Sequence, residues 1–284
     1  MTSSPTVWRR WLAHELKRLR LEAGLSRQQV ADKLRCTPAK VGHFETAVVP
    51  PRVRDLEEIL FDLYNVPEDR REHYLQAARD AKKKGWWERH SESVPDWFSL
   101  YIGLEQGATD IYSWQPQLID GLLQTRAYIE AVMRGGIAEL DEEEIERRVE
   151  LRLSRQQVLK REDAPRLWAV LDVSALRRNI GGPGVMREQL RYLLEVSHLP
   201  KITLQVVDGR SGAHPGLISS FCIMNFEAEM DPGLVYIEYR TGALYLERPA
   251  EIRDHQIAYE HLRLAALRPQ QSRDLITQLI EEHP

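Results

Sequence analysis

The sequence has very little cysteine and no long apolar segment, and both absences narrow what the chain can be. Only two cysteines, Cys36 and Cys222, occur in 284 residues. They lack metal-ligand spacing, so neither a disulfide framework nor a zinc site is expected. No apolar run approaches the ~20 residues that a membrane span requires, and the N-terminal segment lacks the apolar core of a secretory signal. We therefore expect a cytoplasmic protein that does not enter a membrane.

Signatures of common enzymes are missing as well. The sequence contains no P-loop, no H-E-x-x-H and no G-x-S-x-G. The glycine-rich run at 181–184 does not follow a predicted strand and is expected to be a loop before a helix. After position 84 the only lysines are Lys160 and Lys201, which leaves few candidates for Schiff-base chemistry. We expect that the protein is not an enzyme and that it requires no cofactor and no metal.

Three short helices are predicted within the first 45 residues. Residues 8–23 carry leucines at helical spacing. Ser26 and Gln29 form a capping box that begins a second helix, and Thr37-Pro38 begins a third. Only a few residues separate the second helix from the third. This layout is typical of a helix-turn-helix, which lays one short helix in the major groove of DNA.

The expected DNA-binding residues lie on the outer side of the second and third helices and just beyond them. They are Arg27, Gln28, Thr37, Pro38, Ala39, Lys40, His43, Arg52 and Arg54. Gln28, Ala39 and His43 are expected to contact base edges, and the cations and Thr37 to contact phosphates, with Lys40 able to do either. Residues 1–54 carry a net charge of +7 and the remainder carries −11. This asymmetry favours a basic nucleic-acid-binding module joined to an acidic module.

A family resemblance rests on the residues of this first segment. They are Arg20-Leu21-x-Ala23-Gly24-Leu25-Ser26, Val30-Ala31 and Val41-x-x-Phe44-Glu45. The pattern resembles the lambda-repressor-like helix-turn-helix of the Xre type. In that family the counterparts of Arg20 and Glu45 usually form a partly buried ion pair that fastens the first helix to the third, so the resemblance implies this structural role. An ordinary small helical bundle is the alternative.

The rest of the chain also contains familiar motifs. They include Gly85-Trp86-Trp87, Gly121-Leu122-Leu123-Gln124-Thr125, the stretch 152–162, Ile202-Thr203-Leu204-Gln205-Val206, Ala213-His214-Pro215-Gly216 and Thr241-Gly242-Ala243-Leu244-Tyr245. In this order they resemble the uncharacterised C-terminal domain of actinobacterial antitoxin-like transcriptional regulators. The resemblance implies a bacterial regulator that lies on the nucleoid when it is bound. Its protein partner would be small and encoded by a neighbouring gene.

Two domains are expected. Residues 1–84 should form an all-α helix-turn-helix domain of five helices, the last two at 53–64 and 68–84. Residues 85–284 should form an α+β domain with a mixed, partly antiparallel sheet. Its predicted helices are at 96–134, 141–161, 186–197, 249–266 and 272–280, and its predicted strands are at 167–172, 202–208, 217–225, 234–239 and 243–246. The last three strands should be antiparallel, whereas the first two can be parallel.

A groove for a partner or ligand is predicted in the second domain. Four of the seven tryptophans fall between positions 86 and 114, and we expect most of them to be core residues. The candidate groove residues are Trp86, Trp87, Trp114, Leu122, Gln124 and His214. Glu238 and Glu247 could perform acid–base chemistry if they lay close together, but such positions on a strand more often face solvent.

These features predict a sequence-specific DNA-binding transcriptional regulator that acts as a homodimer on a double-stranded operator. Its C-terminal domain would sense or bind a small partner protein. The alternative is a small-molecule-responsive regulator, or an enzyme with an autoregulatory DNA-binding head.

Overall fold

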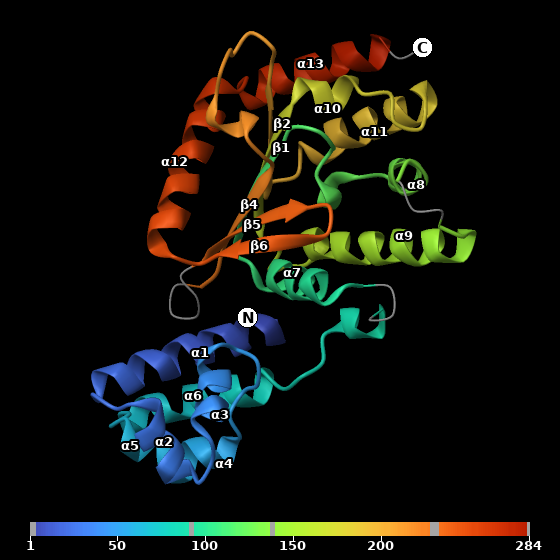
Figure 1. The fold of residues 1–284 in the computed structure, drawn as a ribbon. Coiled ribbons are helices and arrows are strands. Elements are labelled where there is room, and N and C mark those ends of the chain that lie inside the picture. The colour runs from blue at the N-terminus through green and yellow to red at the C-terminus, as the bar shows by residue number, and fades with distance from the viewer. Residues whose placement is uncertain (1–3, 91–93, 137–139, 228–232, 283–284) are drawn as a thin grey trace. The chain divides into compact units, whose positions relative to one another are not determined.

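The computed structural model describes residues 4–90, 94–136, 140–227 and 233–282. It divides into two compact units (Figure 1). The first contains the chain up to Glu88, and the second contains Arg89–Asn225 together with the chain from Gly233 on. In the described residues, no helix combines the length and the apolar character that crossing a membrane would require.

The first unit is all-α, as predicted. Its helices are α1 (Pro5–Glu22), α2 (Arg27–Leu34), α3 (Pro38–Glu45), α4 (Val53–Asp55), α5 (Phe61–Leu63) and α6 (Glu68–Asp80). The π-helical turn Leu56–Leu60 joins α4 to α5, so the two form one continuous helical segment. A short 3-10 helix, Trp86–His90, follows α6.

Two ends of these helices differ from the prediction, and capping explains one of them. Helix α1 begins at Pro5 because the Ser4 hydroxyl accepts a hydrogen bond from the Val7 amide and proline suits the first helical position. Helix α6 ends at Asp80, so Lys82, Lys83 and Lys84, which were predicted to end this helix, lie beyond it. The Lys83 ammonium pairs with Asp80 at 2.6 Å.

The core of the first unit lies where α1 packs on α6. Trp11, Leu12 and Leu16 are buried on the inner face of α1. The ring of Trp11 lies 5.1 Å from that of Tyr74 on α6, and the Tyr74 hydroxyl donates to the Glu15 carboxylate at 2.6 Å. This packing gives the short α2 and α3 a rigid support, which helices of eight residues lack on their own.

The second unit contains a six-stranded sheet in the order β3-β2-β1-β4-β5-β6. The strands are β1 (Asp110–Gln115), β2 (Arg166–Asp172), β3 (Ile202–Val207), β4 (Phe221–Asn225), β5 (Leu234–Tyr239) and β6 (Gly242–Leu246). Strands β1, β2 and β3 are parallel. Strands β4, β5 and β6 are antiparallel, and β4 joins the two halves by pairing with β1. The expected α+β domain with a mixed sheet is confirmed.

Helices cover both faces of this sheet. They are α7 (Asp96–Gly107), α8 (Arg126–Arg134), α9 (Glu142–Gln156), α10 (Val173–Arg177), α11 (Pro183–Val196), α12 (Pro249–Ala265) and α13 (Pro269–Glu282). Helix α12 lies on one side and α7, α9 and α11 lie on the other (Figure 1). Between α12 and the sheet, Trp114, Phe221 and Tyr259 belong to one buried apolar cluster.

The predicted helix over 96–134 is wrong. The structure has α7, then strand β1, a 3-10 turn at Gly121–Leu123 and α8. Strand β1 lies in the interior of the sheet between β2 and β4, and both Ser113 and Trp114 are fully buried. A strand buried on both faces does not alternate between polar and apolar residues. Its pattern therefore merges with those of the flanking helices.

Candidate functional site

The DNA-binding candidates lie around a helix-turn-helix whose two predicted caps form as the sequence indicates. The Ser26 and Gln29 capping box is present, and the Thr37 hydroxyl accepts a hydrogen bond from the Lys40 amide at 3.3 Å. Between α2 and α3 the chain turns at Arg35, whose φ of 49° lies in the left-handed region. Val41 and Phe44 are buried on the inner side of α3, which leaves its outer side facing solvent.

A buried charge network holds α3 from behind. The Arg20 guanidinium on α1 donates to both oxygens of Glu45, at 2.5 and 3.1 Å. The Arg27 Nε donates to the same carboxylate at 2.9 Å, and the Glu45 side chain is only 1% exposed. Burial by itself would raise the pKa of the Glu45 carboxyl, but the hydrogen bonds from the two arginines hold it below its ordinary value. The network ties the start of α2 and the end of α3 to α1.

The outer side of α3 presents the expected mixture of small, polar and cationic groups. Thr37, Ala39 and His43 are exposed, and Pro38 is half-buried. Lys40 is half-buried, and its ammonium lies 5.7 Å from the ring centre of Phe44. These residues lie on one helix of eight residues and its N-cap, and the major groove of DNA admits an α-helix.

The cations near this face differ in whether an ion pair within the protein already engages them, and therefore in their availability for a phosphate contact. Arg27 is committed in part to Glu45, and Arg54 pairs with Glu58 at 2.8 Å. In the part of the chain that the structure describes, Lys40 and Arg52 have no carboxylate partner. Gln28 is exposed, and its amide donates to Asp32 at 2.7 Å. The free positive charge therefore comes from Lys40 and Arg52.

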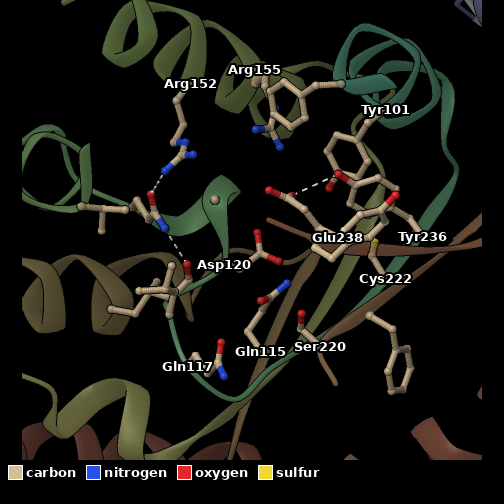
Figure 2. A pocket seen from close by; sticks show the side chains of 18 of the residues that line it. Tyr101, Gln115, Gln117, Asp120, Arg152, Arg155, Ser220, Cys222, Tyr236 and Glu238 are labelled. Carbon is tan, nitrogen blue, oxygen red and sulfur yellow. Dashed lines mark hydrogen bonds between the residues drawn. The ribbon is translucent and has the colours of Figure 1, made fainter. Parts of the chain in front are cut away.

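A cavity of about 460 Å³ lies in the second unit (Figure 2). The residues that line it come from α7, the end of β1, the loop that follows β1, α8, α9, the start of β4 and the end of β5. They are Phe98, Tyr101, Gln115, Gln117, Leu118, Ile119, Asp120, Gly121, Gln124, Val132, Met133, Arg152, Arg155, Ser220, Phe221, Cys222, Tyr236, Glu238, Tyr239 and Arg240.

Two arginines of α9 point into this cavity, and they are in different electrostatic situations (Figure 2). Arg155 donates to both oxygens of buried Glu105, at 2.9 and 2.7 Å. Its guanidinium also lies about 5 Å from the ring centres of Phe98 and Tyr101. Burial would lower the pKa of Arg155, but the Glu105 carboxylate more than offsets this and raises it. Arg155 is therefore fully satisfied by its own domain.

Arg152, one helical turn earlier, is not satisfied in this way. Its Nη1 donates to the Gln124 side-chain oxygen at 2.9 Å. Among the residues that the structure describes, no carboxylate lies within ion-pair distance of it. Burial, and then the neighbouring charge of Arg155, lower the pKa of Arg152 to about 10. The side chain is thus a cation at neutral pH, and the charges of Glu238, Asp120 and Glu105 offset its loss of hydration only in part.

Carboxylates and hydroxyls form the other side of the cavity. Asp120 accepts hydrogen bonds from the Ser113 hydroxyl at 2.5 Å and from the Leu122 amide at 2.8 Å. Glu238 accepts one from the Tyr236 hydroxyl at 3.0 Å. Burial raises the pKa of the Cys222 thiol far above its usual range, so this free cysteine is protonated and unreactive.

Three buried glutamines fix the loop between Asp120 and Thr125. The Gln156 side chain donates to the carbonyls of Gly121 and Gln124. Gln189, from α11, donates to the Leu123 carbonyl at 2.7 Å and accepts from the Thr125 amide at 2.7 Å. Gln124 itself donates to the Ile119 carbonyl at 2.6 Å. This side of the cavity is therefore held by hydrogen bonds from within the domain.

Comparison with known families assigns both units. A model described as a helix-turn-helix domain matches residues 11–74, which include the caps of α2 and α3 and the Glu45 network. A second model, described as a domain of unknown function (DUF5753), matches residues 98–278, more than half of the chain. The protein belongs to the DUF5753 family. No curated protein and no solved structure matches the chain.

The DUF5753 domain contains every residue that lines the cavity, but most of the residues predicted for a groove do not line it. Trp114 and Leu122 are buried in the core. The Trp114 indole donates to the Gly216 carbonyl, and its ring lies 5.3 Å from that of His214. Large aromatic and apolar side chains fill the domain interior because burial stabilises them most there.

The other predicted groove residues divide between the two units. Trp86 and Trp87 belong to the first unit, outside the DUF5753 match, and Trp87 is buried with its ring 6.0 Å from that of Trp86. Of the six candidates, Gln124 alone is among the residues that line the cavity in the DUF5753 domain.

The sequence interpretation named Glu238 but missed the two arginines of the cavity. Arg152 and Arg155 lie on the same side of α9 as buried Ile145 and Val149. A cation placed on the apolar face of an amphipathic helix is unusual unless it has a partner. This pattern is the signal that could have identified Arg152.

Proposed function

We propose that the protein, whose helix-turn-helix domain supports a DNA-binding regulator, is a sequence-specific transcriptional regulator of the Xre type that binds a double-stranded operator as a homodimer. The observation that carries the proposal is α3 with its N-cap, where Thr37, Ala39 and His43 are exposed. Beside them are Lys40 and Arg52, which have no carboxylate partner among the described residues. The buried Glu45 network holds this helix in place from the opposite side.

The small size of α3 supports the proposed homodimer. One helix of eight residues covers only a few base pairs, and two heads on one duplex add their contacts. Half-sites for such a pair lie about one helical turn, ~34 Å, apart. Phosphate contacts by Lys40 and Arg52 would make the affinity depend strongly on salt.

We further propose that the DUF5753 domain is regulatory rather than catalytic and receives a small protein encoded by a neighbouring gene, as in antitoxin-like regulators. Two adjacent apolar residues support a protein-binding surface, because Leu217 is 67% exposed and Ile218 is 91% exposed. Consecutive apolar side chains of such exposure are costly in water unless something covers them. The protein would act in the cytoplasm and associate with the nucleoid when it is bound.

Selection from a random duplex library with the full-length protein tests the DNA-binding proposal. We expect enrichment of a two-fold symmetric sequence whose half-sites are about one helical turn apart. Binding to it should weaken steeply as salt increases. Failure to enrich any sequence at low salt would contradict sequence-specific binding, and enrichment of a single half-site would contradict the homodimer.

Affinity capture with the tagged full-length chain tests the partner. We expect capture from host cells to recover the neighbouring gene's product, and Ile218→Glu to abolish the recovery. Leu264→Glu, at another exposed apolar residue, on α12, is the matched control and should retain it. Equal recovery by both variants would remove Ile218 from the interface, and recovery of no neighbouring product would contradict the protein partner.

A further inference from the structure

The cavity lies at a place in the fold where ligand sites are common. The strand order reverses at β1, because β2 and β3 lie to one side of it and β4, β5 and β6 to the other. The cavity is lined by Gln115 at the carboxyl end of β1 and by Glu238 near the carboxyl end of β5. Crevices beyond the carboxyl ends of strands, at such reversals, are typical ligand sites. A volume of about 460 Å³ is within the range for small organic molecules.

We propose that this cavity binds a small amphoteric organic molecule, with its anionic group against Arg152 and its amino group against Asp120 and Glu238. The size and the paired charges fit an amino acid or a close derivative of one. The proposal does not depend on the DNA-binding function.

The anionic end is indicated by the contrast between Arg152 and Arg155. Both side chains leave the same face of α9 and line the same cavity. Arg155 has a buried carboxylate partner in Glu105, whereas the one hydrogen-bond partner of Arg152 among the described residues is the neutral amide of Gln124. A partly buried guanidinium without an anion loses hydration and gains little in return. A ligand carboxylate would supply the missing bidentate partner.

The place of the ligand's amino group is indicated by carboxylate oxygens of Asp120 and Glu238 that can accept further hydrogen bonds. Each oxygen of an ionised carboxylate can accept two hydrogen bonds. Within the described residues, Glu238 accepts one from Tyr236, and Asp120 accepts one at each oxygen. Figure 2 shows both carboxylates on the side of the cavity away from Arg152. A ligand ammonium placed between them would have acceptors on two sides.

The remaining lining suits a polar molecule with one larger side chain. Gln115, Gln117 and Ser220 offer neutral donors and acceptors, while Tyr239 offers a ring surface. A purely apolar ligand would leave Arg152 and the two carboxylates desolvated and unpaired, which is unfavourable. The cavity is therefore not suited to a fatty acid chain or a plain hydrocarbon.

Thermal unfolding of the full-length protein without ligand or DNA tests the role of Arg152. We expect Arg152→Met to leave the Tm unchanged or to raise it, because it removes a desolvated charge that has no ionic partner. Arg155→Met should lower the Tm markedly, since it leaves Glu105 buried and unpaired. Arg148→Met, at a partly exposed residue of α9 paired with Glu144, is the control for loss of a surface arginine. If Arg152→Met lowers the Tm as much as Arg155→Met, Arg152 is a structural residue and the proposal fails.

Ligand-induced shifts in Tm test the class of molecule. The probes are the standard L-amino acids, each at about 10 mM, and an occupied site should raise the Tm by about 2 °C or more. For a probe that binds, the matched acid without the amine and the matched amine without the carboxylate should each lose most of the shift. Arg152→Met should also lose it, and Arg148→Met should keep it. Absence of a shift with every probe, or an unchanged shift in Arg152→Met, overturns the proposal. Neither result depends on whether DNA is bound.

Discussion

Each half of the molecule contains a buried arginine–glutamate pair, and the two pairs are completed differently. In the head, Glu45 takes hydrogen bonds from Arg20 and also from Arg27, so a second arginine is drawn into the network. In the DUF5753 domain, Glu105 takes both of its side-chain hydrogen bonds from Arg155, and the second arginine, Arg152, remains outside the pair. The same chemistry fastens helices together in one region and leaves a cation facing a cavity in the other.

The largest expected loss of stability comes from breaking the Glu105–Arg155 pair. Glu105→Ala should destabilise the DUF5753 domain by about 3–5 kcal/mol, because the Arg155 charge would stay buried without a counter-charge. Chemical denaturation of the full-length protein measures this loss. The double variant Glu105→Met, Arg155→Met should recover much of it, since apolar residues can replace a buried pair. A loss below about 1 kcal/mol in the single variant would show that water reaches Arg155.

In the helix-turn-helix domain, Glu45→Ala should lower the free energy of unfolding by less, about 3 kcal/mol, because Arg27 is 44% exposed and can be rehydrated. Amide hydrogen exchange in α1 and α3 measures this loss, since it reports on this domain alone. Arg27→Ala is the matched control and should cost about 0.5 kcal/mol, as exposed ion pairs do. Equal effects of the two substitutions would mean that Arg20 contributes little to the network.

The Glu45 network should also make the stability of the head depend on pH. A carboxyl whose pKa is lowered in the folded state contributes stability above its unfolded pKa, and this contribution is lost as the pH falls through the folded value. For Glu45 the loss should begin near its ordinary pKa of 4.5 and continue below it. Denaturation curves between neutral and acidic pH measure this dependence. The free energy of unfolding should fall less steeply with decreasing pH in Glu45→Gln than in the unsubstituted protein. An unchanged pH dependence would contradict the role of Glu45.

Lys40→Ala tests the exposed side of the same head. It should weaken operator binding by about 1–3 kcal/mol, the range for one good base contact, and should leave the unfolding of the head unchanged. Mobility-shift titration at fixed salt measures the affinity. Lys33→Ala, an exposed cation of α2, is the control and should have little effect. Unchanged affinity in Lys40→Ala would remove this residue from the interface.

The smallest expected effect concerns the turn between α2 and α3. Arg35→Gly should stabilise the head by about 0.5 kcal/mol, because glycine adopts the left-handed conformation without strain but also makes the unfolded chain more flexible. Arg35→Ala keeps the strain and removes the same charge, so comparing the two variants by denaturation isolates the backbone term. Lower stability in the glycine variant would show that the Arg35 side chain matters more than its backbone.

Local patterns predicted the head better than the site of the second domain. Ser26, Thr37 and the apolar face of α3 act within a few residues along the chain, so their spacing was sufficient to identify the helix-turn-helix. The cavity instead brings together residues as distant as Phe98 and Glu238, and no short window contains this relation. Trp114 illustrates the difference, because we expected it to line a groove, whereas the strand that carries it lies inside the sheet.

The buried glutamines that hold the loop Asp120–Thr125 affect how quickly a ligand could enter the cavity. Gln156 and Gln189 already hold the backbone of this loop, so little conformational entropy would be lost when a guest enters. Recognition would then proceed by fit to a preformed shape, without a slow rearrangement step. The fraction of protein with an occupied cavity would therefore follow the ligand concentration in the cell without delay.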